Sequence, residues 1–348
     1  MTVGPAIRLE GLRKSFGAKK ALDGVDLTMA AGQVFGLLGP NGAGKTTAVR
    51  IITTLLRPDG GRAVVAGADV VADPDRVRRS IGLSGQYAAV DDKLTGFENL
   101  YLVAKLYGMR RRRAARTARE LLERFRLDDA ADRGAGTYSG GMRRRLDLAG
   151  ALVAAPPVVV LDEPTTGLDP QSRLNTWDVV AELVRDGTTV LLTTQYLEEA
   201  DQLADRIAVL ADGRVIAEGT SDELKSATGG ERLELVAADE AGLAAAHRIL
   251  AGIGGVPPTL DRRARRLEVA VGATQSGQHA LAAAAARLNA EHVRVLDLGL
   301  RRATLDDVFL SLTGASTPTR DSEETVILPP ITDWPRHSGR LDRTEAGA

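Results

Sequence analysis

A glycine-rich segment carries the most specific chemistry in the sequence. It reads Gly39-Pro40-Asn41-Gly42-Ala43-Gly44-Lys45-Thr46-Thr47 and matches the pattern G-x-x-x-x-G-K-[ST]. Glycines let backbone N–H groups converge on phosphate oxygens, and the N-terminus of a following helix adds partial positive charge. Lys45 would reach the β- and γ-phosphates, and the Thr46 hydroxyl would bind Mg²⁺. We therefore predict a nucleoside triphosphate site; a glycine-rich turn without function is the alternative.

An acidic pair supplies the second half of this chemistry. Asp162 and Glu163 follow the apolar run from Val158 to Leu161, which predicts a buried strand. Ligands bind at the carboxyl ends of parallel strands. Asp162 is expected to accept a hydrogen bond from a water on Mg²⁺, and Glu163 to orient or deprotonate the water that attacks the γ-phosphate. The alternative is a polar strand end at a turn.

A third motif predicts a second anion site. Ser139, Gly140 and Gly141 precede the apolar-periodic stretch from Leu146 to Leu152, so they fall at a helix N-terminus. One nucleotide cannot easily use both phosphate sites within one chain. We therefore expect each glycine-rich loop to face the Ser-Gly-Gly helix of a second copy, in a homodimer.

The elements that position these motifs are those of an α/β protein. Short strands are expected between residues 7 and 38, a helix from Thr47 to Leu56, and helices again between about 97 and 155. No G-x-G-x-x-G occurs at the glycine-rich turn, which argues against a Rossmann dinucleotide site.

The chain of 348 residues divides into an expected nucleotide-binding domain at 1–228, with a helical subdomain at about 92–155. A small α+β domain is expected at 229–314 and a disordered tail at 315–348. Lys plus Arg number 45 against 46 Asp plus Glu, so no global field attracts nucleic acid. There is no cysteine, and no run of 18 apolar residues, so we expect no membrane span.

Taken in order, these motifs resemble those of the ABC-transporter ATPases, over roughly residues 7 to 225. The family signature is L-S-G-G-Q, and here Tyr138 and Met142 replace its first and last residues. The resemblance implies a P-loop NTPase fold with a parallel-sheet core, an antiparallel β subdomain and a helical insertion. It also implies that the protein binds ATP with Mg²⁺, that ATP drives two copies to dimerise, and that the ATP is then hydrolysed.

Four further residues acquire roles through this resemblance. Phe16 looks like the aromatic that stacks on adenine, with a plain core residue as the alternative. Gln86 looks like the glutamine that senses Mg²⁺ and the attacking water and contacts the membrane partner, with an exposed loop amide as the alternative. Asp169, in Gly-Leu-Asp, looks like the D-loop aspartate that crosses the dimer interface.

The fourth residue departs from the family pattern. Gln195, in Thr-Thr-Gln-Tyr, stands where the family usually has a switch histidine. Its amide can donate a hydrogen bond to the γ-phosphate but cannot carry a proton at neutral pH. We expect Gln195 to keep the contact and Glu163 to act as the base.

Longer phrases are similar to the daunorubicin-resistance branch of bacterial exporters: residues 84–91, 138–147, 194–201 and 305–314. The branch implies a separately encoded transmembrane permease, export of hydrophobic antibiotics or lipids, and a peripheral position at the cytoplasmic face of the membrane. The alternative is a soluble ABC ATPase of DNA repair or translation. Against it, the stretch between Lys45 and Ser139 shows no sustained heptads, and the chain has a single P-loop and signature. A small-molecule phosphotransferase would have no use for the signature helix.

Overall fold

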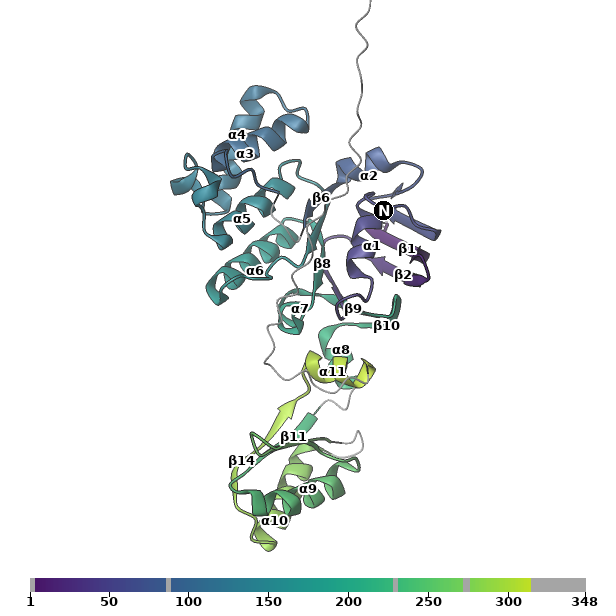
Figure 1. The fold of residues 1–348 in the computed structure, drawn as a ribbon, viewed down its shortest axis with the longest axis vertical. Helices are drawn as coiled ribbons and strands as arrows, with labels where there is room; N and C mark the ends of the chain where they lie inside the picture. The colour runs from purple at the N-terminus through teal and green to yellow at the C-terminus, as the bar shows by residue number, and fades with distance from the viewer. Residues whose placement is uncertain (1–3, 86–88, 228–230, 272–275, 314–348) are drawn as a thin grey trace, which may run out of the picture. The chain divides into compact units, whose positions relative to one another are not determined.

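Three β-sheets organise the computed structural model, which describes residues 4–85, 89–227, 231–271 and 276–313 (Figure 1). The central sheet has six strands in the order β10-β9-β3-β8-β7-β6. All neighbours pair in parallel except β10, which runs antiparallel to β9 at the edge. Its strands are β3 (Val34–Leu38), β6 (Ile81–Ser84), β7 (Val158–Asp162), β8 (Thr189–Thr194), β9 (Arg206–Ala211) and β10 (Arg214–Gly219).

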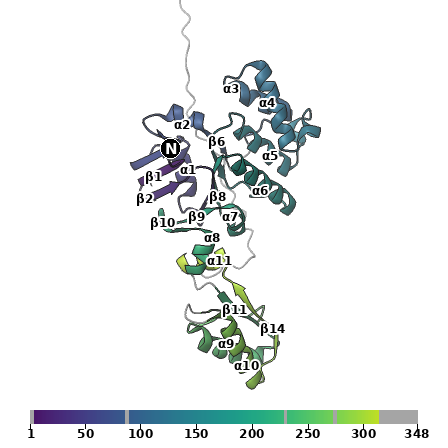
Figure 2. The same cartoon turned by 180° about the vertical axis from the view of Figure 1, so that it is seen from behind.

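Helices cover both faces of this sheet (Figures 1 and 2). Successive residues of a strand point to opposite faces. Val160 of β7 packs in the core that contains α1 (Lys45–Ile52), whereas Val159 packs in the core that contains α5 (Gly140–Ala151) and α6 (Pro170–Arg185). The continuous apolar runs of β7 and β8 are therefore buried on both sides, as parallel strands require.

A second, antiparallel sheet lies against α1 and has the order β2-β1-β4-β5. Its strands are β1 (Ile7–Phe16), β2 (Lys19–Met29), β4 (Gly60–Val65) and β5 (Ala68–Asp69). The expectation of short strands was wrong for β1 and β2, which have 10 and 11 residues. Shifts of register between β1 and β2 interrupt their alternation of apolar and polar residues, and this interruption makes two long strands resemble several short ones.

The helix that follows the glycine-rich loop, α1, begins at Lys45 and ends at Ile52, so the predicted range of Thr47 to Leu56 was wrong at both ends. Thr54 adopts a positive φ of 63°, and the N–H groups of Leu55 and Leu56 both donate to the Arg50 carbonyl. This turn stops the helix before the apolar pair Leu55 and Leu56.

The helical insertion contains α3 (Gly96–Leu106), α4 (Arg111–Arg124) and α5, with short 3₁₀ turns at Asp128–Ala130 and Ala135–Thr137. Thr95 caps α3 in a capping box with Glu98. The apolar face of α4 packs into the same core as α5, and its arginines point outward. The other helices of this part are α2 (Pro74–Ser80), α7 (Leu197–Leu203) and α8 (Ser221–Ala227).

The third sheet belongs to a small α+β unit with the strand order β12-β13-β11-β14. It consists of β11 (Glu231–Ala237), α9 (Glu240–Gly254), β12 (Thr259–Asp261), β13 (Arg266–Ala270), α10 (Gly277–Ala290) and β14 (Val295–Arg302). Both helices bury apolar side chains against one face of the sheet. The predicted fold class is confirmed, including this α+β unit.

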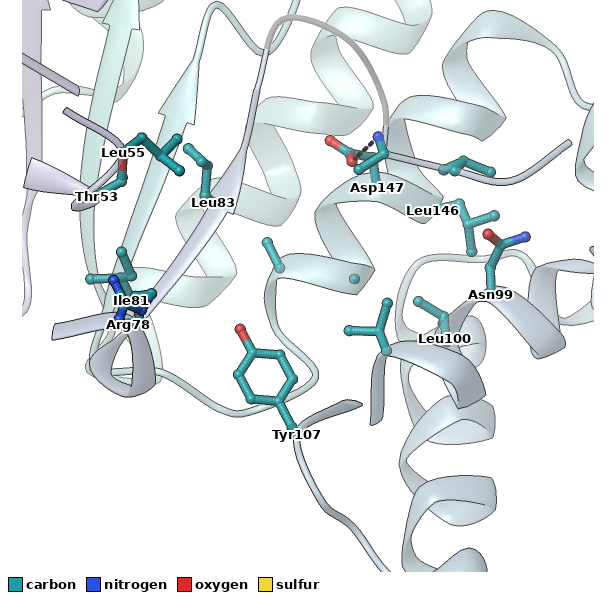
Figure 3. Close-up of a pocket in the computed structure, with 15 residues that line it drawn as sticks. Thr53, Leu55, Arg78, Ile81, Leu83, Asn99, Leu100, Tyr107, Leu146 and Asp147 are labelled. Atoms are coloured by element: carbon teal, nitrogen blue, oxygen red, sulfur yellow. Dashed lines mark hydrogen bonds between the residues drawn. The ribbon is translucent and has the colours of Figure 1, made fainter. Parts of the chain in front are cut away.

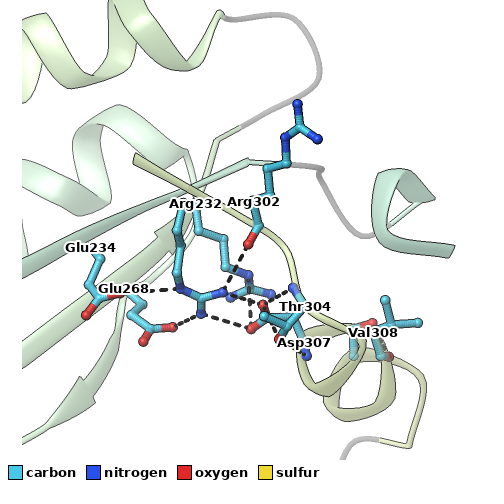
Figure 4. Close-up of polar contacts among 9 residues, drawn as sticks. Arg232, Glu234, Glu268, Arg302, Thr304, Asp307 and Val308 are labelled. Atoms are coloured by element: carbon cyan, nitrogen blue, oxygen red, sulfur yellow. Dashed lines mark hydrogen bonds and ion pairs between the residues drawn. The ribbon is translucent and has the colours of Figure 1, made fainter. Parts of the chain in front are cut away.

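An ion-pair network ties this sheet to the last helix, α11 (Leu305–Thr313) (Figure 4). Arg301 contacts the carboxylates of Asp307 at 2.6 Å and Glu268 at 2.5 Å, and Asp307 also pairs with Arg232 at 3.2 Å. The hydrogen bond to Asp307 is the main reason why the pKa of Arg301 is raised. Because each charge has a partner of opposite sign, this network holds the domain together and offers no free charge to a ligand.

The expected tail at 315–348 and the expected domain boundary at residues 228–230 lie outside the described residues. None of the helices in the described part of the chain combines the length and the hydropathy of a bilayer-spanning segment.

Candidate nucleotide-binding site

The register of the central sheet brings the predicted motifs to one edge. Leu38, the last residue of β3, pairs with Thr194 of β8, and Thr193 pairs with Asp162, the last residue of β7. Strand β6 pairs with β7 on the far side. The glycine-rich loop, Gln195 and the acidic pair therefore leave three adjacent strands at their carboxyl ends, which is where open α/β sheets bind ligands.

The glycine-rich loop is shaped by close backbone contacts. Gly44 has a φ of 112°, and a Cβ at this position would lie 2.4 Å from the carbonyl oxygen of Ala21. Only glycine fits this position. No side chain caps the first turn of α1, so the backbone N–H groups of that turn remain available to an anion.

Lys45 lies inside this loop with 5% of its surface exposed. Its ammonium donates to the carbonyl oxygens of Gly39 at 2.6 Å and Pro40 at 3.2 Å. Burial lowers the pKa of Lys45, and the carboxylates of Glu163 and Asp162 act in the opposite direction. The Lys45 ammonium can therefore bind phosphate oxygens at the loop, while the two carboxylates help to hold it in place.

The acidic pair has two distinct environments. Asp162 is buried, with 5% exposed, and its Oδ1 accepts a hydrogen bond from the Thr193 hydroxyl. Glu163 is more exposed, and its Oε2 accepts from the Thr166 hydroxyl at 3.3 Å. One carboxylate is thus fixed within the sheet edge, while its neighbour can reach a water at the surface.

The backbone of Glu163 adopts the left-handed conformation, with a φ of 51°. This conformation costs a non-glycine residue about 1 kcal/mol or more. The Glu163 N–H donates to the Thr193 carbonyl at 3.0 Å, which holds the turn against the neighbouring strand. The Glu163 side chain therefore points in a different direction from the one that it would have if β7 continued through this residue.

Two other predicted residues are exposed: Gln195 at this edge of the central sheet and Phe16 in the antiparallel sheet. Gln195 is exposed directly after β8, and the following N–H, that of Tyr196, donates to Thr194 Oγ1 at 2.9 Å. Phe16 ends β1 with 52% of its surface exposed, and the Lys14 ammonium lies 5.8 Å from its ring centroid. An open aromatic face is what stacking on a base requires. Gln86 lies outside the described residues.

Ser139 is the N-cap residue of α5, and its hydroxyl accepts from the Met142 N–H at 3.2 Å. A Cβ on Gly141 would lie 2.4 Å from Ser172 Oγ, so glycine permits close contact between α5 and α6. Asp169 caps α6 through Ser172, and these hydrogen bonds lower the pKa of Asp169. The Ser-Gly-Gly motif and the D-loop aspartate are thus neighbours in the structure.

The Ser-Gly-Gly helix and the glycine-rich loop belong to opposite faces of the central sheet. The helix α1, which follows the loop, packs on one face, and α5 packs on the other (Figures 1 and 2). The helices that follow the two predicted anion sites therefore pack on different faces of the sheet.

Sequence reasoning missed the buried polar groups that connect these motifs. Thr193 bonds to Asp162, and Arg144 and Asp147 form a buried ion pair on α5. The available signal was the presence of two opposite charges three residues apart among the apolar residues of a helix. Arg144 donates to the backbone on both sides of Glu163, at Asp162 and Pro164.

A pocket of about 320 Å³ opens between the central sheet and the helical insertion (Figure 3). Leu83 and Ile81 of β6 line one side, and Leu100 and Tyr107 line the other. The large side chains at its rim are unusually exposed, with Leu55 at 66% and Tyr107 at 45%. An open apolar pocket of this kind is typical of an interaction site.

Comparison with known proteins identifies the family. Residues 22–166 match the family model described as ABC transporter. The daunorubicin resistance ATP-binding protein DrrA2 of Streptomyces coeruleorubidus is 54% identical over 321 residues, which cover 92% of this chain and 99% of that protein. The chain belongs to the ABC transporter ATPases.

Two further proteins support this membership. The doxorubicin resistance ATP-binding protein DrrA of Mycobacterium tuberculosis (strain ATCC 25618 / H37Rv) is 48% identical to this ABC ATPase over 315 residues, which cover 88% of this chain and 93% of that protein. A dimeric ATP-binding cassette, solved in a post-hydrolysis state with ADP and phosphate, has a TM-score of 0.56 and 28% identity. The match covers 62% of this chain and 98% of the cassette.

Proposed function

We propose that this ABC ATPase binds Mg·ATP between two copies of itself and hydrolyses it to drive export of hydrophobic drug-like molecules through a separate membrane subunit. The observation that carries the proposal is that the helices that begin at the two anion sites, α1 and α5, pack on opposite faces of one sheet. A nucleotide that uses both sites needs the second site from another copy, and the chain is similar to a cassette solved as a dimer with ADP and phosphate.

Within this arrangement the loop from Gly39 to Thr47 cradles the phosphates and Lys45 neutralises them. Phe16 stacks on the adenine through its exposed ring. Ser139, Gly140 and Gly141 of the partner copy close the site from the other side. Asp169 lies beside that motif through Ser172, so it reaches the same interface.

The residues present fit a hydrated Mg²⁺ held mainly by the nucleotide. Among the described residues no cluster of three or more His, Asp or Glu side chains forms a protein cage for a metal. Mg²⁺ prefers one or two protein oxygens together with phosphates and waters. Thr46 and Gln86 would provide these oxygens, and Asp162 would accept a hydrogen bond from a bound water. When bound, the ion supplies charge neutralisation across the β- and γ-phosphates.

Hydrolysis is assigned to Glu163 and Gln195. The Glu163 carboxylate accepts a proton as the water oxygen bonds to the γ-phosphorus and the bond to the ADP oxygen breaks. The Gln195 amide donates to the γ-phosphate without changing charge. Lys45 and the loop N–H groups stabilise the negative charge that the leaving ADP gains.

The membrane subunit is proposed to dock in the pocket between β6 and α3. The pocket is mostly apolar, although Arg78, Asn99 and Asp147 also line it. Its rim exposes Leu55 and Tyr107, and Ala89, which follows residues 86–88, is one of its lining residues. A short helix of a membrane protein, presenting apolar side chains, would fill a space of about 320 Å³. The chain would then sit peripherally on the cytoplasmic face of the membrane.

The substrate class follows the relatives. Two of them carry daunorubicin or doxorubicin resistance in their names, and a third, from Rhizobium sp. (strain N33), is a Nod factor export ATP-binding protein at 45% identity over 63% of this chain and 72% of that relative. None of these three is a DNA-repair or translation protein, so the alternative of a soluble ATPase acting on DNA or ribosomes gains no support.

Transport is tested in a drug-sensitive bacterium that produces the chain together with the proposed membrane subunit, a multi-span protein to be sought in the neighbouring reading frames. We expect cells to accumulate less doxorubicin, measured by its fluorescence, than cells with the Lys45→Ala variant and the same membrane protein. Equal accumulation in the two strains, at equal amounts of both proteins, would contradict drug export.

A further inference from the structure

A buried arginine on the helix of the Ser-Gly-Gly motif holds the loop that carries Glu163. Arg144 is 7% exposed, and its Nε donates to the Pro164 carbonyl at 2.7 Å. One terminal nitrogen of the guanidinium lies 3.4 Å from the Asp162 carbonyl. These two carbonyls belong to the residues on either side of Glu163, so one planar group fixes both ends of its left-handed turn.

Asp147 holds Arg144 in place. It lies one turn further along α5, is 6% exposed, and its Oδ2 is 3.5 Å from the guanidinium. The same carboxylate accepts from the Ser84 hydroxyl at 2.5 Å and from the Ala89 N–H at 2.7 Å. Arg144 also donates to the Gly85 carbonyl. The ion pair therefore joins α5 to the end of β6 and to the loop after β7.

Burying two charges is costly, and hydrophobic residues of similar size often stabilise a core equally well. A stability role alone gives little reason for a fork-shaped cation at this point. The shape of guanidinium does suit the task of holding two carbonyls with fixed separation, because its N–H groups diverge in one plane. The turn at Glu163 is strained and needs such a restraint, since otherwise the carboxylate would lose its aim.

We propose that Arg144, anchored by Asp147, is a positioning residue that sets the orientation of Glu163 for hydrolysis. The inference rests on the proposed role of Glu163 as the base. It adds a structural link: α5 starts with the motif assigned to the partner's nucleotide, and about one turn later it holds the loop that carries the base assigned to the chain's own nucleotide. In a dimer, each α5 helix would then connect one nucleotide site with the other.

The test compares Arg144→Gln, Arg144→Lys and Asp147→Asn with Arg145→Gln as a matched control. Arg145 lies on the same helix and donates to the Phe125 carbonyl at 3.1 Å, away from Glu163. For each full-length variant, kcat and KM for ATP are measured with the Kd of a fluorescent ATP analogue and the melting temperature. We expect Arg144→Gln to lower kcat roughly 10- to 100-fold while Kd stays within about threefold.

Arg144→Lys keeps the charge but not the fork, so its kcat should fall nearly as far. Asp147→Asn should show the same split between kcat and Kd at smaller amplitude. The Arg145→Gln control should stay within about twofold of the parental kcat. If Arg144→Gln does not fold, Arg144→Lys and Asp147→Asn decide the matter, and parental kcat in both would overturn the proposal.

A double mutant separates positioning from general stability. Glu163→Gln alone should be nearly inactive, and adding Arg144→Gln should reduce the residual rate no further, because Arg144 acts through Glu163. A further drop of tenfold or more would show that Arg144 acts otherwise and would overturn the inference. Parental hydrolysis by Glu163→Gln would instead refute the proposed base itself, so the two failures are distinguishable.

Discussion

At the scale of single residues, the glutamine at position 195 is the clearest departure from the family pattern. Its side chain is exposed at the end of β8, one strand away from both the glycine-rich loop and the acidic pair. A neutral amide there can hold a phosphate oxygen but cannot take part in proton transfer. This is why we propose Glu163, and not Gln195, as the base.

Replacing this residue gives a first prediction. Gln195→Ala should lower kcat by about 10-fold or more, because a donor to the transferring phosphoryl group is lost. Gln195→His should retain hydrolysis and gain a pH dependence near the ordinary histidine pKa of about 6.5. Steady-state hydrolysis from pH 5.5 to 8.5 checks both. A parental rate in Gln195→Ala would show that this amide does not touch the reacting phosphate.

A second residue-scale prediction concerns Glu199 of α7, whose side chain is fully buried and accepts a hydrogen bond from the Trp177 indole at 3.2 Å. Burial raises its pKa; the hydroxyls of Thr194 and Thr165 and the indole of Trp177 act in the opposite direction. The folded chain therefore holds this proton more tightly than the unfolded chain does. Stability must fall as pH rises above the unfolded value of about 4.5 toward the folded pKa.

The variant Glu199→Gln cannot ionise and should flatten this fall. Chemical denaturation at several pH values from 4.5 to 8 measures the free energy of unfolding of both proteins. The difference in this free energy, variant minus parent, should grow with pH across that interval. A difference that is constant or shrinks with pH would mean that Glu199 is ionised in the folded protein throughout.

The contacts made by single residues are also where sequence reasoning reached least far. The motif of Lys45 and the acidic pair could be predicted because each lies in a continuous pattern. Thr193 and Arg144 could not, because their partners, Asp162 and the carbonyls around Glu163, lie on other elements. Only the register of the sheet and the packing of α5 bring these groups together.

At the scale of elements, periodicity predicted type better than extent. The run at β7 and the helices of the insertion were predictable, because burial on two faces or on one stripe leaves a clear pattern. The end of α1 was not, since Thr54 turns the chain before the apolar pair Leu55 and Leu56. Tertiary contacts decide such boundaries.

Helix α11 gives an element-scale prediction. Leu305 and Val308 are 3% and 2% exposed and pack with Ile207 of β9 and Leu224 of α8. Leu305→Ala should lower the free energy of unfolding of this region by about 3 kcal/mol, because a buried cavity is left. Leu312 on the same helix is 39% exposed, and Leu312→Ala should change this free energy of unfolding by less than about 0.5 kcal/mol.

Hydrogen exchange of α11 and α8, followed by mass spectrometry, reports this local stability. Faster exchange in Leu305→Ala but not in Leu312→Ala is the expected outcome. Equal exchange in the two variants would mean that α11 is not anchored by its buried face.

At the scale of the whole molecule, the fold class followed from the motifs and their order, whereas the return of α11 to the nucleotide-binding part did not. Residues 305–308 pack with residues 200–224, although the small α+β unit lies between these two segments in the sequence. A contact between segments so far apart leaves no periodic trace in the sequence. The pocket between β6 and α3 was equally unpredictable, because it arises from the packing of the insertion on the sheet.

This pocket supports a prediction about assembly. Leu55→Arg should weaken co-purification with the proposed membrane subunit by about 10-fold or more, because a charge would replace an apolar contact. ATP binding should be unchanged, since Leu55 lies away from the glycine-rich loop. Unimpaired co-purification of Leu55→Arg would place the membrane contact elsewhere.

The central claim is that nucleotide lies between the glycine-rich loop of one copy and the Ser-Gly-Gly helix of another. Its most direct test is the molar mass of Glu163→Gln, measured by light scattering at saturating Mg·ATP, alone and with the membrane protein. We predict a dimer of the ATPase that reverts to monomer with ADP and that fails to form when Ser139→Arg is added. A chain that stays monomeric with ATP in both settings, or dimerises despite Ser139→Arg, would contradict the account.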